Sequence, residues 1–245
     1  KQRKGREYGG AAQQRDREVA EEGARRAARS GSEYDELVAE GLRYASKQDW
    51  RKAGKANREA IALRPDEPTA YFNLGAALTN SGHIVEAAQR YLEARERFPV
   101  GSELWAEATA YAFDVLSEKD CDEVAKPEWW NDEALKALSA RVVMVAPNDE
   151  GANKMRAYVL SGLDDDARVK LRSAAEFKQA ATHWERAAEL SHAPAVKVER
   201  AASADWCRNR ARQLIRASVL LELDAQVEEA KHKVEEARLE QAQLS

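Results

Sequence analysis

The sequence predicts an all-α fold in which helix pairs stack into a right-handed α-solenoid. Three observations predict it. Helix-forming residues dominate the composition, and runs of valine and isoleucine are scarce. Glycine and proline lie between blocks of helical periodicity rather than within them. A pattern of apolar and small residues returns after 34 residues, which is the spacing of a helix–turn–helix unit that cannot bury its apolar face alone.

The 34-residue pattern has six positions that keep their chemical character in both copies. The first copy predicts helices over 34–46 and 49–63, and the second turns at 80–82, where the sequence reads Asn-Ser-Gly. A proline closes each copy, because proline cannot continue a helix. The paired positions are Leu37 and Tyr71, Gly41 and Gly75, Tyr44 and Leu78, Ala53 and Ala87, Ala60 and Ala94, and Pro65 and Pro99.

Over residues 34–101 this pattern resembles the tetratricopeptide repeat. The first copy departs from the family at Glu40, where leucine is usual, and at Asn57, where an aromatic residue is usual. The resemblance implies stacked helix pairs whose concave face binds other proteins without catalysis. The residues of the second copy that match the family are Tyr71, Leu74, Gly75, Leu78, Ala87, Tyr91, Ala94 and Pro99.

Two stretched units of about 45 residues are expected to follow. In the first of them a polar insertion at 118–128 separates two helices, and in the second Ala180, Trp184 and Ala187 repeat the small–aromatic–small spacing. We therefore expect one solenoid over 32–194, with units at about 34–67, 68–101, 102–148 and 149–194. The predicted helices of the stretched units are 103–117, 131–145, 150–161 and 167–191.

A basic polar extension, 1–31, precedes the solenoid. It holds nine Lys and Arg against five Asp and Glu, a net charge of +4, which leaves −8 for the remainder of a chain of net charge −4. Ala11–Ser30 has high helix propensity but no apolar stripe, so by itself we expect it to be disordered or a fraying helix. An ordered extension here would indicate a larger assembly.

The last segment, 195–245, contains neither glycine nor proline, which predicts one helix of about 50 residues, roughly 70 Å long. Trp206, Leu214, Ala217 and Leu221 suit a helix that caps the last repeat. From Leu220 the apolar spacing becomes that of a short coiled coil, and two interpretations stay open: a coil that pairs with itself or a partner, and a solvated extension. The seam is Leu220, Leu223, Val227, Ala230, Val234, Ala237, Gln241 and Leu244.

No constellation of residues predicts chemistry. The histidines His83, His183, His192 and His232 lack a second histidine or a cysteine three or four residues away, and Cys121 and Cys207 lack metal-ligand spacing. Asp164-Asp165-Asp166 is interpreted as helix capping rather than as a metal site. We therefore expect no enzyme activity, no cofactor and no metal. The acidic body also makes nucleic acid an unlikely partner, and no apolar run reaches the length of a membrane span.

Binding of a chaperone C-terminal tail, a known function of the family, is not expected. The family's carboxylate clamp would use five positions, and only Asn73 matches it; Val38, Leu42, Glu103 and Ala106 do not. Unneutralised carboxylates would there face apolar and acidic side chains.

The predicted function is a non-catalytic scaffold or adaptor that holds a partner helix or extended segment on the concave face. The alternative is a constitutive subunit of a large multiprotein complex, for example a chloroplast or mitochondrial one, held by the N-terminal extension and the C-terminal helix. Adjacent tryptophans before a helix could pack as a staple or serve as an exposed anchor. The candidate partner-binding residues are Arg43, Tyr71, Asn73 and Ala77 on the first helices, and Trp129 and Trp130 in the insertion.

The cysteine usage predicts a reducing compartment. Because the sequence begins at Lys1 rather than at methionine, we expect a soluble cytoplasmic protein, or a chloroplast or mitochondrial protein after loss of an N-terminal segment.

Overall fold

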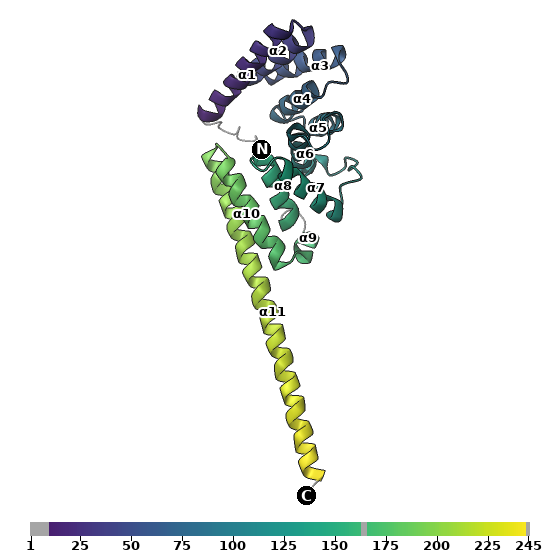
Figure 1. Ribbon diagram of the computed structural model, residues 1–245, viewed down its shortest axis with the longest axis vertical. Coiled ribbons are helices and arrows are strands. Elements are labelled where there is room, and N and C mark those ends of the chain that lie inside the picture. The colour runs from purple at the N-terminus through teal and green to yellow at the C-terminus, as the bar shows by residue number, and fades with distance from the viewer. Residues whose placement is uncertain (1–9, 163–165, 244–245) are drawn as a thin grey trace.

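The computed structural model describes residues 10–162 and 166–243, and within these ranges it contains helices and no strand (Figure 1). The predicted all-α class is therefore confirmed. The helices are α1 (Gly10–Ser30), α2 (Glu33–Ser46), α3 (Trp50–Leu63), α4 (Pro68–Ser81), α5 (Ile84–Arg97), α6 (Glu103–Leu116), the 3₁₀ turn η1 (Lys119–Cys121), α7 (Asp132–Val145), α8 (Glu150–Ser161), α9 (Asp166–Leu171), α10 (Ala174–Leu190) and α11 (Pro194–Gln243).

The helices stack in chain order, as in a solenoid. Each helix from α1 to α8 packs against the next one, and α8 packs against α10, which in turn packs along α11. Figure 1 shows that the stack curves, with α2, α4, α6 and α8 toward the inner side and α3, α5 and α7 toward the outer side. Direct contacts between α2 and α4, and between α6 and α8, join the first helices of successive pairs.

A glycine facing a large side chain sets the closeness of each regular helix pair. A Cβ atom on Gly75 would lie 2.9 Å from the ring of Tyr91, which is buried. In the first pair, a Cβ atom on Gly41 would lie 2.5 Å from the Asn57 side-chain nitrogen. Asn57 thus occupies the aromatic position of the family pattern and makes the equivalent contact with a polar side chain.

The predicted helix over 167–191 is interrupted. The helix is interrupted at Arg172 and Ser173. α10 then begins with a capping box, in which the side chains of Ser173 and Glu176 each accept a hydrogen bond from the other residue's backbone N–H. The sequence Ser-Ala-Ala-Glu carries this signal, so the interruption has a local cause. Of the three predicted capping aspartates only Asp166, the first residue of α9, lies within the described residues; Asp164 and Asp165 lie outside them.

The N-terminal extension packs in a way that the missing apolar stripe did not predict. α1 lies along α2, and Ala20 and Ala27 are buried there. A Cβ atom on Gly23 would lie 2.9 Å from the Leu42 side chain, so this contact depends on small residues that let two helices approach closely. The expectation of a fraying helix is corrected for this part. Residues 1–9 lie outside the described residues.

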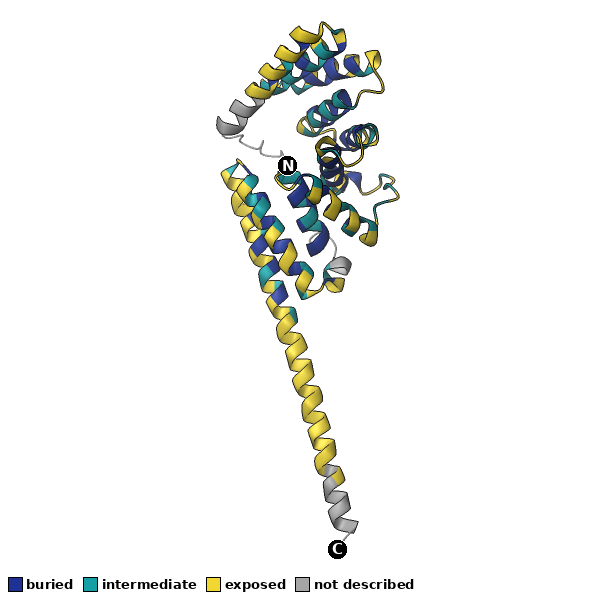
Figure 2. Cartoon of the chain, in the orientation of Figure 1, coloured by how far each residue is buried: buried dark blue, intermediate teal, exposed yellow. Residues whose placement is uncertain are grey.

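α11 covers α10 over its first part and then leaves the body. Cys207 and Ala211 are buried against α10, and Trp206 meets Phe177 edge to face with ring centroids 5.6 Å apart. The sequence places Leu221 in the capping contact, but its side chain is 71% exposed, so this expectation is corrected. Figure 2 shows the exposed rod that follows. Leu244 lies outside the described residues.

Candidate functional site

The partly exposed side chains of α4, α6 and α8 form a continuous surface, which we call the inner face. Two contacts join these helices directly: the rings of Phe72 and Tyr111 meet edge to face with centroids 5.4 Å apart, and Lys154 donates to the Asp114 carboxylate. The helices that carry it lie on the inner side of the curve in Figure 1. The inner face comprises Phe72, Asn73, Ala76, Thr79, Glu107, Tyr111, Asp114, Lys154 and Tyr158.

An aromatic cluster forms the centre of the inner face. Tyr111 stacks on the buried ring of Tyr91 at 5.3 Å between centroids, and Phe72 packs edge-on against both. Tyr111 nevertheless keeps 40% of its surface exposed. A ring that is held in place and still exposed is well suited to contact a partner, because little side-chain entropy remains to be lost on binding.

Glu107 lies beside this cluster and has an unusual charge state. Burial, together with a smaller effect of the nearby Asp149 carboxylate, raises the pKa of Glu107 to about 7. Asp149 cannot be displaced easily because it caps α8 by accepting a hydrogen bond from the Ala152 backbone N–H at 2.7 Å. Within residues 10–162 and 166–243, Glu107 forms no ion pair, so no cation compensates its charge when the carboxyl ionises.

A cavity of about 510 Å³ continues the inner face toward the C-terminal helices. It opens between α6, the turn around η1, α8 and α11. Phe113, Tyr158 and Trp184 supply its aromatic part, and Tyr158 and Trp184 pack edge to face at 4.9 Å. Charged groups of both signs supply the rest, among them Lys119, Asp122 and Glu199.

Three of the candidate residues from the first helices lie on α4. Tyr71 and Ala77 are buried, which leaves little of either side chain for a partner, and their role in binding stays a prediction. The Tyr71 hydroxyl donates to the Pro65 carbonyl at 2.9 Å, and the Arg97 guanidinium lies over its ring at 4.2 Å. Asn73 is partly exposed on the inner face, yet its side-chain nitrogen is buried without a hydrogen-bond partner among the described residues. The helical spacing predicted the side of α4 on which Asn73 lies, but it did not predict that Tyr71 and Ala77 are buried.

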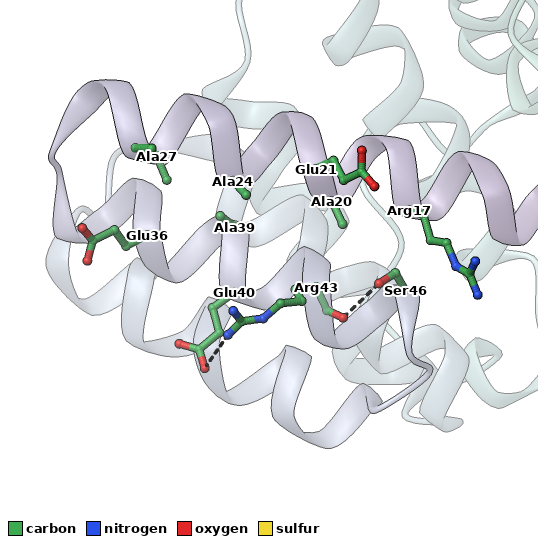
Figure 3. Close-up of a pocket in the computed structure, with 11 residues that line it drawn as sticks. Arg17, Ala20, Glu21, Ala24, Ala27, Glu36, Ala39, Glu40, Arg43 and Ser46 are labelled. Carbon is green, nitrogen blue, oxygen red and sulfur yellow. Dashed lines mark hydrogen bonds and ion pairs between the residues drawn. The ribbon is translucent and has the colours of Figure 1, made fainter.

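The fourth candidate, Arg43, lies away from the inner face. It is exposed on α2 and pairs with Glu40 at 3.6 Å. Figure 3 shows it at the edge of a groove of about 560 Å³ between α1 and α2, whose floor is formed by alanines, among them Ala20, Ala24 and Ala39. The structure thus separates Arg43 from Asn73 rather than bringing them together.

Trp129 and Trp130 are both half-buried and pack on the body. Their rings lie 5.6 Å apart; Trp130 packs against Phe113, and the Arg95 guanidinium lies 5.2 Å from the centre of Trp129. Both side chains join the clusters formed by α5 and α6. Of the two interpretations offered by the sequence, this geometry favours packing. Reasoning from the sequence missed Glu107 and Tyr111, although their spacing of four residues would have placed them on one side of a helix.

The described residues show no cluster of the kind that binds a metal. Within 10–162 and 166–243, no group of three His, Cys, Asp or Glu side chains could hold a metal ion. Burial raises the pKa of Cys207 to about 12 and also raises that of Cys121, so both thiols are held in the protonated form. Among the described helices, none is long and apolar enough to cross a membrane.

Comparison with known proteins identifies the repeat. Residues 41–82, from within α2 to the turn after α4, match the family model of the TPR repeat. Residues 41–82 therefore carry a tetratricopeptide-type repeat. Such repeats form scaffolds for protein–protein interaction. Among solved structures, the crystal structure of MamA is similar, with 12% identity over 73% of this chain and 96% of that chain and a TM-score of 0.43. No curated protein matches the chain.

Proposed function

We propose that the protein is a non-catalytic scaffold that holds a helix or an extended segment of a partner on the inner face. The observation that carries this proposal is Tyr111, an aromatic side chain that is fixed by Tyr91 and Phe72 yet 40% exposed. Rigid aromatic residues at the centre of a surface are the usual energetic anchors of protein interfaces. The cavity beside Tyr158 extends this surface and offers room for a side chain of the partner.

Site-specific photo-crosslinking in native extract tests the proposal. A photoreactive phenylalanine analogue replaces Tyr111 on the inner face or, as a control, Val85, which is 50% exposed on α5 on the outer side. We expect a discrete crosslinked partner from position 111 and none from position 85. Crosslinks of equal yield at both positions, or at 85 alone, would contradict binding on the inner face.

The second candidate function is a constitutive subunit of a large complex that is held through α11. It is favoured by a row of exposed apolar side chains beyond the body, in which Leu220, Leu223, Val227 and Val234 are 50–59% exposed. Removal of residues 218–245 would then release the protein from a complex of fixed stoichiometry, as measured by co-elution from native extract. A spread of substoichiometric partners that survives the truncation would favour the adaptor.

Under either candidate, 32–194 serves as the repeat array, 1–31 as the N-terminal extension and 195–245 as the capping helix and tail. The buried free thiols of Cys121 and Cys207 support a reducing compartment, cytoplasmic or organellar. Fractionation of cells that express a tagged full-length protein would assign the compartment.

A further inference from the structure

Charge is distributed unevenly along the inner face. On α4 the partly exposed polar side chains, Asn73 and Thr79, are uncharged, whereas α6, α8 and α11 bring carboxylates. Two cations of this region, Lys154 and Arg200, already form ion pairs within the protein. Lys154 is paired with Asp114, and Arg200 pairs with Glu150 at 2.5 Å while also donating to a backbone carbonyl.

Three carboxylates remain without an ion pair among the described residues: Glu107 on the inner face, and Asp122 and Glu199 at the cavity. Among the residues that line the cavity, Lys119 is the one cation without an ion pair, and the nearby Lys126 donates to the backbone carbonyls of Leu116 and Cys121. The region between α6 and α11 therefore presents an excess of negative charge around aromatic surface.

We propose that the inner face between α6 and α11 binds a basic segment of a partner protein, with one lysine or arginine beside Glu107 and Tyr111 and a second in the cavity. Such a side chain combines an apolar stem, which packs on aromatic rings, with a cationic head that pairs with a carboxylate. The inference rests on the proposed function and specifies the chemistry of its partner.

Glu107 discriminates between partners of opposite charge. Because Glu107 is partly buried beside Tyr111, an ion pair formed there is screened less than one at the open surface. A cation would stabilise its ionised form, whose pKa is now raised by burial and by Asp149. An acidic segment would instead add a like charge, which both Glu107 and Asp149 oppose.

The test measures binding of a labelled peptide of alternating lysine and leucine to the full chain by fluorescence anisotropy at two salt concentrations. Glu107→Gln removes the charge at the inner face, and Glu96→Gln on the exposed surface of α5 removes the same charge elsewhere. We expect a five- to tenfold weaker affinity for Glu107→Gln and less than a twofold change for Glu96→Gln. Circular dichroism of both variants checks that they remain folded.

Equal affinity of the wild type and Glu107→Gln for the lysine peptide would overturn the inference. Tighter binding of the matched peptide of alternating glutamate and leucine would overturn it as well. Failure of the proposed function gives a different result, because the crosslink from position 111 in native extract would then be absent. A crosslink at 111 combined with no effect of Glu107→Gln leaves the scaffold standing and rejects the basic partner.

Discussion

Gly75→Ala tests how tightly the second helix pair is packed. Two effects oppose each other. Alanine is favoured over glycine within a helix by about 1 kcal/mol. Its Cβ atom, however, would lie 2.9 Å from two carbons of the Tyr91 ring, a distance that real contacts of this kind do not show.

The ring has little freedom to move away. Tyr91 is 1% exposed and is held between Phe72 and Tyr111, with centroids at 5.4 Å and 5.3 Å. Insertion of a methyl group into such a core costs about 1–3 kcal/mol. After the helix-propensity gain is subtracted, we expect Gly75→Ala to lower the free energy of unfolding by about 1 kcal/mol.

Gly54→Ala is the matched control. Gly54 is also buried within a helix, but a Cβ atom there would meet Arg58 at 3.5 Å and Leu74 at 3.6 Å, which are ordinary contacts. We expect this variant to gain about 1 kcal/mol. The two variants should therefore differ by about 2 kcal/mol, or about 4–8 °C in melting temperature for a chain of this size.

The assay is thermal and urea unfolding followed by circular dichroism. A double-mutant cycle isolates the contact: with Tyr91→Leu as the background, Gly75→Ala should lose its penalty. Equal stabilisation by Gly75→Ala and Gly54→Ala in the wild-type chain would refute the packing argument. So would a penalty at position 75 that persists after the ring has been removed.

Three further predictions concern titratable groups. Glu107→Gln should be more stable than the wild type by up to about 3 kcal/mol at pH 8 and equally stable at pH 4. The reason is that the folded-state pKa of about 7 exceeds the ordinary 4.5, so ionisation of Glu107 above pH 4.5 disfavours the folded state. Urea unfolding measured as a function of pH tests this. Asp132→Asn should cost about 1–2 kcal/mol at pH 7, after allowance for solvent at Asp132, because the buried Arg172 then keeps only the more distant Glu176 carboxylate, at 4.0 Å, as an ion-pair partner. Arg172 and Lys136 lower the Asp132 pKa to about 2, so this stabilisation is complete above about pH 4 and is lost as the pH falls toward 2; equal wild-type and variant stability at pH 7 would contradict it. Cys121 and Cys207 should react with a thiol reagent only after urea unfolding, because burial raises both pKa values; rapid labelling of the native protein would contradict this.

The sequence by itself determined the helix pairs of this protein. Proline and glycine mark the ends of helices through backbone geometry, and periodic small residues mark the sides on which helices meet; both are local properties of the chain. The bounds of α2, α3, α6, α7 and α8 agree with the expected ones to within about one residue, which is the ordinary scatter of helix ends. The capping signal at Ser173 was equally local, although only the structure drew attention to it.

The tertiary structure alone decided which side chains are available to a partner. Tyr71 and Asn73 are two residues apart on one helix, yet Tyr71 is buried under Arg97 and Asn73 remains partly exposed. Glu107 acquires its raised pKa from burial and from Asp149, which lies on another element of the chain. Burial depth and charge proximity depend on how helices from distant parts of the sequence pack together. Helical periodicity indicates only the side of a helix on which a residue lies. It therefore predicts the architecture, whereas the side chains that a partner can reach depend on how the helices pack.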